Sequence, residues 1–156
     1  MASVLDAFAS VASFTLTLAS LANSTVGVGR QSTLVDNTTN KYTSALISLN
    51  IKVGTTPTAN SIIYVYLIRS NNDGTQIADD NAGASDAGIT IVNAPLLGTI
   101  LVPDATSNAN YRKIFDTKFL GSLGPEWGIA IVNSSGVALN ASEGAYSWIG
   151  VSQTVA

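Results

Sequence analysis

The stretch from Thr43 to Ser70 constrains the fold more than any other part of the sequence. In its first half, apolar residues fall at every second position: Ala45, Ile47, Leu49, Ile51 and Val53. A period of two is typical of a β-strand that has one face in a hydrophobic core. Residues 54–60 contain Gly54 and Pro57, which favour a turn. The pattern therefore predicts one β-hairpin, with its second strand beginning near Ile62.

The predicted second strand, residues 62–68, is apolar at every position. A strand that carries apolar side chains on both faces needs a cover on both faces. One cover is the domain core, and the other is a loop, a chain arm or a neighbouring molecule. This asymmetry favours assembly over catalysis, and it makes four residues candidates for an interface: Ile62, Tyr64, Tyr66 and Ile68.

Residues 1–13 precede the patterned part of the chain, and we expect them to form a short helix or an extended arm. Val4, Leu5, Phe8, Val11 and Ala12 could share one helical face, and Val4, Leu5 and Phe8 are the groups that a docking arm would carry. A free arm would leave these side chains in water, so one hypothesis is that the arm docks on a neighbouring molecule. The alternative is an unattached leader, because chain termini are often poorly ordered.

Further strands are predicted where short apolar segments alternate with turn signals, at residues 14–18, 31–35, 97–102, 111–115, 126–133 and 146–155. Ser134, Ser135 and Gly136 resemble a hairpin turn from which residues 137–139 return. This pattern predicts an all-β fold, an antiparallel two-sheet β-sandwich, with residues 14–156 as a single domain. Long connections at residues 71–88 and 103–110 favour a jelly roll, and an immunoglobulin-like sandwich is the second choice.

Composition excludes the common catalytic constellations. The chain contains no cysteine and no histidine, so it lacks the usual general base and the usual zinc ligands. A carboxylate pair could still hydrolyse glycosides, and Glu126 beside Trp127 is the best candidate for such a site. The competing interpretation places Trp127 in the core and Glu126 in water. We therefore expect no enzyme activity and no cofactor.

Charge and hydropathy argue against two classes of partner. The net charge is −3, and the seven basic residues are scattered, whereas a nucleic-acid-binding surface needs a basic stripe. No apolar run reaches the length of about 18 residues that a transmembrane helix needs. No basic segment precedes the apolar N-terminus, so we expect no signal peptide. Neither nucleic acid nor a membrane is expected as a partner.

Four aspartates in the long connection at residues 71–88 suggest a calcium site, because clustered carboxylates are typical calcium ligands. They are Asp73, Asp79, Asp80 and Asp86. Their spacing does not match the EF-hand pattern. Solvated turn residues are therefore the favoured interpretation, and we predict no metal site.

Two aromatic pairs suggest sugar binding without catalysis, as in lectin-type jelly rolls. Tyr64 and Tyr66 share one face of their predicted strand, and Tyr146 and Trp148 share one face of theirs. Aromatic pairs on one sheet face are more often packing partners than sugar platforms. The sequence leaves both interpretations open.

Three segments resemble small structural proteins of tailed bacteriophages, most closely capsid decoration or cement proteins. They are residues 59–69 (ANSIIYVYLIR), 86–90 (DAGIT) and 119–133 (FLGSLGPEWGIAIVN). The resemblance extends from about Arg30 to the end of the chain. It implies a β-sandwich, often a trimer, that sits on the outer capsid surface, bridges neighbouring subunits and braces the shell against DNA pressure. It implies no catalytic residues.

The expected function is therefore that of a phage virion protein made in the host cytoplasm and located on the capsid surface. Its expected partners are the major capsid protein and two further copies of itself in a homotrimer. Burial of a shared apolar strand would stabilise such an oligomer. The alternative from a different class is a tail or head-fibre module that binds host-surface glycans.

Overall fold

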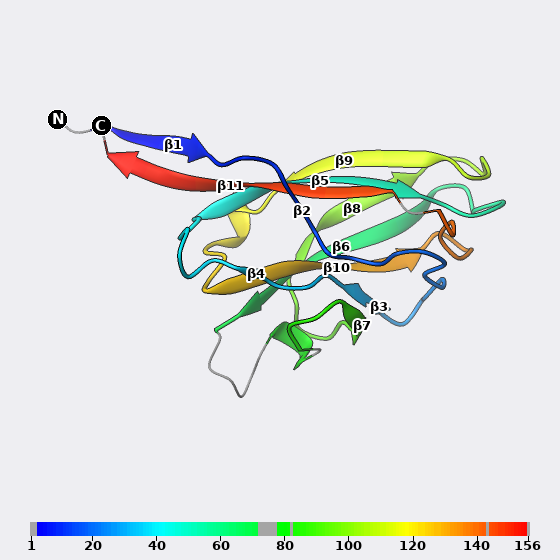
Figure 1. Ribbon diagram of the computed structural model, residues 1–156. Coiled ribbons are helices and arrows are strands. Elements are labelled where there is room, and N and C mark those ends of the chain that lie inside the picture. The colour runs from blue at the N-terminus through cyan, green and yellow to red at the C-terminus, as the bar shows by residue number, and fades with distance from the viewer. Residues whose placement is uncertain (1–2, 72–77, 82, 143, 156) are drawn as a thin grey trace.

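The computed structural model describes residues 3–71, 78–81, 83–142 and 144–155. Two antiparallel β-sheets face each other across a hydrophobic core (Figure 1). Two short 3₁₀-helices, η1 (Asp79–Asn81) and η2 (Lys118–Leu120), lie in the connections. The prediction of an all-β fold with two packed antiparallel sheets is confirmed.

One sheet has five strands, and the order of four of them is β1-β11-β5-β9. These are β1 (Val4–Phe8), β11 (Ala145–Val155), β5 (Ser44–Lys52) and β9 (Asn110–Asp116). The fifth strand, β2 (Ala12–Ser13), also pairs with β11. We call this the five-stranded sheet.

The opposite sheet has six strands, and the order of five of them is β7-β3-β10-β6-β8. These are β7 (Ala87–Thr90), β3 (Val28–Gln31), β10 (Glu126–Ser134), β6 (Ser61–Ser70) and β8 (Leu96–Val102). The sixth strand, β4 (Val35–Asp36), pairs with β10. We call this the six-stranded sheet.

The two strands of the predicted 43–70 hairpin lie in different sheets, so that prediction is wrong. β5 pairs with β11 and β9, whereas β6 pairs with β10 and β8. The residues between them cross from one sheet to the other, and both strands direct their apolar faces into the same core. The predicted hairpin at residues 134–139 is also wrong, because Leu139 forms an isolated bridge with Val53 and does not pair with β10.

The core contains the alternating residues of β5 and the inner faces of β6 and β10. Ile47, Leu49 and Ile51 are buried opposite Ile63, Val65 and Leu67. Three aromatic rings pack edge to face at its centre: Trp127 lies 5.2 Å from Trp148 and 5.6 Å from Phe14, measured between ring centroids. On β11, the side chains of Tyr146 and Trp148 point into the core.

Residues 14–18 alternate in burial as predicted, but they do not form a regular strand. The backbone N–H of Phe14 donates to Tyr146 of the five-stranded sheet, and that of Thr33, beside β3, donates to Thr15. The segment therefore passes from one sheet toward the other. The predicted strand at 31–35 is also divided, because β3 ends at Gln31 and β4 begins at Val35.

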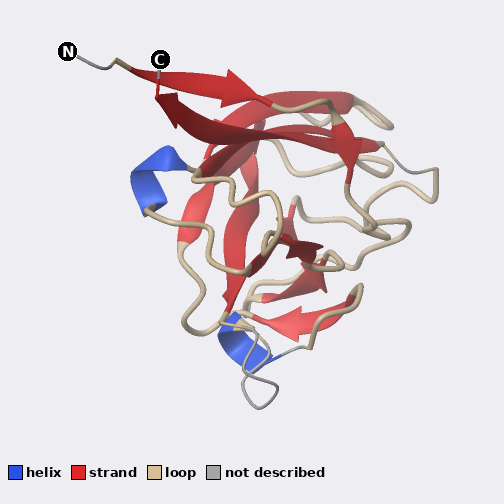
Figure 2. Ribbon diagram, turned by 60° about the vertical axis from the view of Figure 1, so that its left-hand side comes forward, coloured by secondary structure: helices blue, strands red, loops and turns tan. Residues whose placement is uncertain are grey.

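The N-terminal segment is extended, so the helical alternative is wrong. β1 pairs with β11 from Val4 opposite Val155 to Phe8 opposite Val151. The pairing of β5 with β11 ends at Val151, so residues 152–155 of β11 pair with β1 alone. These residues and β1 form a two-stranded ribbon, the terminal ribbon, that projects beyond the rest of the sandwich (Figure 2).

Candidate interaction surface

The outer face of the five-stranded sheet carries exposed apolar side chains from several strands. Ile149 of β11 pairs with Leu46 of β5, and Ile114 of β9 lies beside Ser48. Val11, Leu46, Ile114 and Ile149 line one shallow hollow of about 270 Å³. Phe8 lies on the same face of the sheet. It pairs with Val151, and Val151 and Ile149 share one face of β11 because they are two positions apart. We call these five residues the apolar surface.

Three residues of the apolar surface are mostly exposed to solvent. Phe8 is 64% exposed, Val11 66% and Ile114 68%. Single exposed apolar residues are common, whereas a large contiguous group is typical of an interaction site, so this group is a candidate surface. The sheet holds this group in place through the registers of β1, β11, β5 and β9.

The terminal ribbon extends the exposed apolar area. Val4, Leu5 and Val155 are each more than half exposed. The backbone N–H of Ala9 donates to the carbonyl of Gly150. Along an antiparallel pair of strands, hydrogen-bonded and non-hydrogen-bonded residue pairs alternate. The backbone N–H and C=O groups of Val4, Asp6 and Phe8 therefore point away from β11, toward the open edge of β1. A two-stranded ribbon on its own is marginally stable in water. Contact with a partner would cover both its side chains and its edge.

The structure divides the predicted interface residues between the two sheets. Val4, Leu5 and Phe8 lie on β1 at the edge of the five-stranded sheet, and they are exposed as the docking hypothesis requires. Ile62, Tyr64 and Tyr66 are half-buried on the outer face of the six-stranded sheet. The two groups therefore do not form one surface.

Ile68 is not available to a partner, which corrects its assignment as an interface residue. Its side chain is 0% exposed and packs with Ile89, Ala94 and Ala130 in a second core cluster on the outer face of the six-stranded sheet. Of the covers considered for the apolar 62–68 strand, a segment of the same chain, which includes β7, is the one found at Ile68. The segment from η1 to residue 94 supplies it.

Sequence reasoning missed Val11, Leu46, Ile114 and Ile149 as interface residues. Leu46 stands among polar residues on the outward face of β5, and this break in the alternation was the available signal. Ile114 and Ile149 are distant from it in sequence, and only the registers of β5 with β9 and β11 bring the three together. A single sequence does not contain those registers.

The aromatic candidates for sugar or glycoside chemistry divide in the same way. Trp127, Trp148 and Tyr146 belong to the main core cluster, so neither Glu126–Trp127 nor Tyr146–Trp148 forms an open sugar platform. Tyr64 and Tyr66 stay half-buried at the surface, with ring centroids 6.4 Å apart. Of the two proposed pairs, this one remains accessible to a ligand.

The described acidic residues of the 71–88 connection form hydrogen bonds with other parts of the same chain. Asp80 accepts hydrogen bonds from the backbone N–H groups of Val92, Asn93 and Ala94 at 3.0, 2.7 and 3.0 Å. Asp79 accepts one from the backbone of Arg69. Asp73 lies outside the described residues. Within the described part of the chain, no group of three or more acidic residues is placed to share a metal ion.

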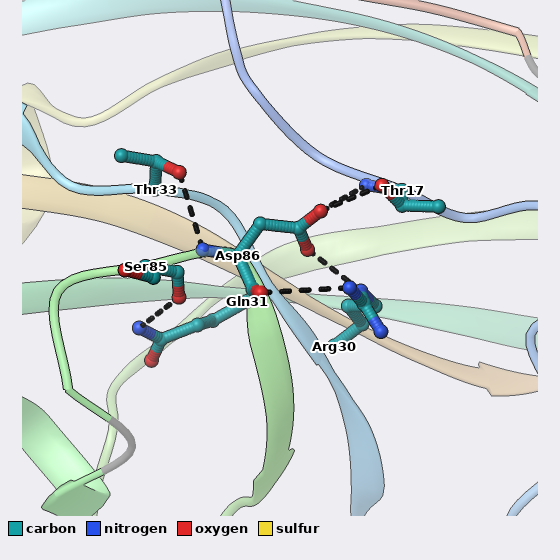
Figure 3. Close-up of polar contacts among 6 residues, drawn as sticks. All are labelled: Thr17, Arg30, Gln31, Thr33, Ser85 and Asp86. Carbon is teal, nitrogen blue, oxygen red and sulfur yellow. Dashed lines mark hydrogen bonds and ion pairs between the residues drawn. The ribbon is translucent and has the colours of Figure 1, made fainter.

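Asp86 is the centre of a polar network that holds the start of β7 against β3 (Figure 3). Its carboxylate accepts from Arg30 Nε at 2.6 Å and from the hydroxyl and N–H of Thr17 at 2.6 and 3.1 Å. Its own N–H donates to Thr33, and Gln31 donates to the carbonyl of Ser85. Segments far apart in sequence are joined here, which indicates a structural role.

The pKa values of Asp80 and Asp86 reflect these contacts. Burial alone would raise the pKa of Asp86, but hydrogen bonds from Arg30 and Thr17 and the arginine charge hold it below the ordinary 3.8. Burial would also raise the pKa of Asp80, but the hydrogen bonds from its three backbone N–H donors outweigh burial, so the pKa of Asp80 is lowered as well. Both side chains are therefore stabilised in the ionised form.

Acid is therefore expected to loosen the segment that covers Ile68. A carboxyl group with a lowered folded-state pKa stabilises the fold above its unfolded-state pKa, and this contribution is lost as the pH falls through the folded-state value. The thermal midpoint should be flat from pH 7 to pH 5 and should fall below about pH 4. The hydrogen-exchange protection factors of Val92–Ala94 should fall over the same range.

Asp80→Asn provides the control for the acid prediction. The two carboxylate oxygens of Asp80 accept three backbone hydrogen bonds, whereas the amide of asparagine has only one acceptor oxygen. The variant should therefore be less stable at pH 7 and less sensitive to acid. If the thermal midpoint fell with pH equally steeply in the variant and the parent protein below pH 5, the acid response would belong to other carboxyl groups.

The fold and this surface define an all-β sandwich with an exposed apolar outer face. Comparisons with protein-family models, with curated proteins and with solved structures each return no match. Among the described residues, no helix is long and apolar enough to cross a membrane.

Proposed function

We propose that the protein is a non-enzymatic structural protein of a tailed-phage virion, a decoration protein that binds the outer capsid surface. Its partners are the major capsid protein and two further copies of itself, and it is made in the host cytoplasm. The observation that carries this proposal is the apolar surface on the five-stranded sheet together with the terminal ribbon. The sequence resemblance to phage decoration proteins supports the class of partner.

The apolar surface favours a lasting contact. Complete burial of a large apolar side chain contributes about 1.5–3 kcal/mol. Phe8, Val11 and Ile114 are each about two-thirds exposed, so a partner that covers them would gain about 1–2 kcal/mol from each. Further area comes from Val4, Leu5 and Val155. A protein packed at high copy number on a shell needs contacts of this kind.

The jelly-roll form of the sandwich belongs to the proposal. Successive strands β8, β9, β10 and β11 alternate between the two sheets, which supports Greek-key connections. The low content of charged residues, 11%, also suits close packing of identical copies, because strong like charge would repel neighbours.

Re-binding to capsids tests the proposal directly. Purified protein would be mixed with capsids that lack it, and the particles would be imaged by cryo-electron microscopy. We expect density at regular positions on the outer shell, with three-fold symmetry and the five-stranded sheet at the contact. Bare shells, or density confined to the tail, would refute the decoration function.

Ile114→Asp is expected to weaken capsid binding at least tenfold, a change of about 1.4 kcal/mol in binding free energy. The substitution places a charge in an apolar contact, while the 68% exposure of Ile114 leaves the fold stable. Quantitative sedimentation with capsids measures the effect. Leu101→Asp is the matched control, since Leu101 is 55% exposed on the opposite sheet. A stronger effect of Leu101→Asp would place the contact on the six-stranded sheet.

A further inference from the structure

A second candidate site lies on the outer face of the six-stranded sheet, away from the apolar surface. It is an open hollow of about 490 Å³, lined by Ser24, Thr25, Gly27, Tyr64, Tyr66, Val132 and Ser134. Its volume falls within the range of about 300–1,000 Å³ that ligand pockets occupy. Its floor belongs to β6 and β10, where Tyr64 pairs with Val132.

Hydrogen bonds hold one wall of the hollow to β10. The backbone N–H of Ser24 donates to Asn133 at 2.7 Å, and the hydroxyl of Ser134 donates to the carbonyl of Ser24. The Ser24 hydroxyl in turn accepts from the N–H groups of Val26 and Val28. The wall is therefore formed before any ligand arrives, which reduces the ordering cost of binding.

Gly27 completes this wall in a conformation that suits glycine. Its φ angle is +78°, and a side chain there would place its Cβ 3.2 Å from the carbonyl oxygen of Ile91. The Gly27 carbonyl accepts the N–H of Ile91 at 3.0 Å. The wall is thereby joined to the segment that follows β7.

The two tyrosines form a fixed aromatic side of the hollow. Their ring planes are 32° apart, and Tyr66 packs against the second core cluster. Within the described part of the chain, neither hydroxyl makes a hydrogen bond, so both are available to a ligand. Burial is the main cause that raises the pKa of Tyr66, and the neighbouring Tyr64 raises it further. The Tyr66 hydroxyl is therefore protonated at neutral pH and can donate a hydrogen bond.

The lining combines aromatic rings with hydroxyl groups, and none of the seven lining residues carries a formal charge. Sugar rings match this combination, because their C–H faces pack on aromatic rings and their hydroxyls exchange hydrogen bonds with serine, threonine and tyrosine. A charged ligand would find no counter-ion among these residues. We infer that the hollow is a binding subsite for a neutral carbohydrate.

A proline-rich peptide is the competing ligand, because such peptides also dock on aromatic grooves. The hydroxyl-bearing wall favours the sugar. A proline-rich segment could accept from these hydroxyls through its carbonyl groups, but it offers few donors, whereas each sugar hydroxyl can both donate and accept.

The test uses the complete protein without capsids. An array of neutral and acidic oligosaccharides is screened first, and binding is then measured by saturation-transfer NMR with the methyl glycosides of galactose, glucose and mannose. We expect millimolar or tighter binding of a neutral sugar, with saturation transfer to its C–H face. Tyr64→Ala should weaken binding at least tenfold.

Thr25→Trp keeps the inference falsifiable if Tyr64→Ala is poorly folded. Thr25 is exposed, so a large side chain there fills the hollow without entering the core, and it should abolish sugar binding. Tyr111→Ala, on β9 of the opposite sheet, is the matched control and should bind normally. Binding that survives both Thr25→Trp and Tyr64→Ala would overturn the inference.

Two further results would also overturn it: no sugar bound at millimolar concentration, or proline-rich peptides bound in place of sugars. The result is independent of the proposed decoration function. Tyr64→Ala should still bind capsids, and Ile114→Asp should still bind the sugar. Failure of one function therefore leaves the other to be judged separately.

Discussion

Trp127→Ala is expected to lower the free energy of unfolding by about 3–5 kcal/mol. The side chain is 0% exposed and lies at the centre of the aromatic cluster with Trp148 and Phe14. Its removal leaves a cavity between the two sheets, where both neighbouring rings lose their edge-to-face contacts. Domains of this size are stable by only about 5–15 kcal/mol, so the variant should be close to unfolding at 37 °C.

Trp127→Phe is the matched control for this prediction. The indole Nε1 of Trp127 is buried and has no hydrogen-bond partner among the described residues, so phenylalanine removes that unfavourable group while it keeps an aromatic ring. We expect a loss well below that of alanine. Urea denaturation followed by far-UV circular dichroism measures both variants. Equal losses would show that the indole itself, rather than aromatic volume, holds the sheets together.

The sequence predicted which residues are buried better than it predicted which strands are neighbours. The alternation from Ala45 to Val53 correctly placed each of these side chains in the core. Periodicity reports the face of a strand that meets the core, but both sheets of a sandwich present the same pattern. Whether β6 follows β5 in the same sheet or in the opposite one is therefore not encoded in the pattern.

The connection at residues 54–60 shows why the hairpin interpretation failed. A tight hairpin needs a short turn such as Asn-Gly, whereas seven residues separate Val53 from Ser61. This length also suffices to cross the core to the other sheet. Pairing of β5 with β11, about a hundred residues away, competes with local pairing and prevails. Which distant strand β5 pairs with depends on how all the strands pack in the core, and the 54–60 connection alone does not determine it.

The candidate surface was predictable only in part for the same reason. Val4, Leu5 and Phe8 were identified because apolar residues in a terminal segment need a cover, and they are exposed. The opposite face of the 62–68 strand also needed a cover, and the chain itself supplies one at Ile68. That cover depends on Asp80, whose three backbone donors lie 12 to 14 residues further along the chain. No spacing rule identifies such contacts.

Ile68→Asp is expected to destabilise the fold by about 3–5 kcal/mol at pH 7, because it places an unpaired charge inside the second core cluster. Ile68 is 0% exposed and packs against Ile89 and Ala94. A carboxyl group at this site would escape part of the cost by remaining protonated. The difference in stability between the variant and the parent protein should therefore shrink as the pH falls from 7 to 5.

The same substitution at Ile114 separates a structural role from an interaction role. Ile114 lies on the outer face of the opposite sheet and is mostly exposed, so Ile114→Asp should change the free energy of unfolding by less than about 0.5 kcal/mol while it weakens capsid binding. Urea denaturation at pH 7 and pH 5 measures the stability, and quantitative sedimentation with capsids measures the binding. If Ile68→Asp stayed fully stable, the segment from η1 to residue 94 would not cover Ile68 in solution. The apolar outer face of β6 would then be open to a partner, and the six-stranded sheet would compete with the apolar surface as the capsid-binding face.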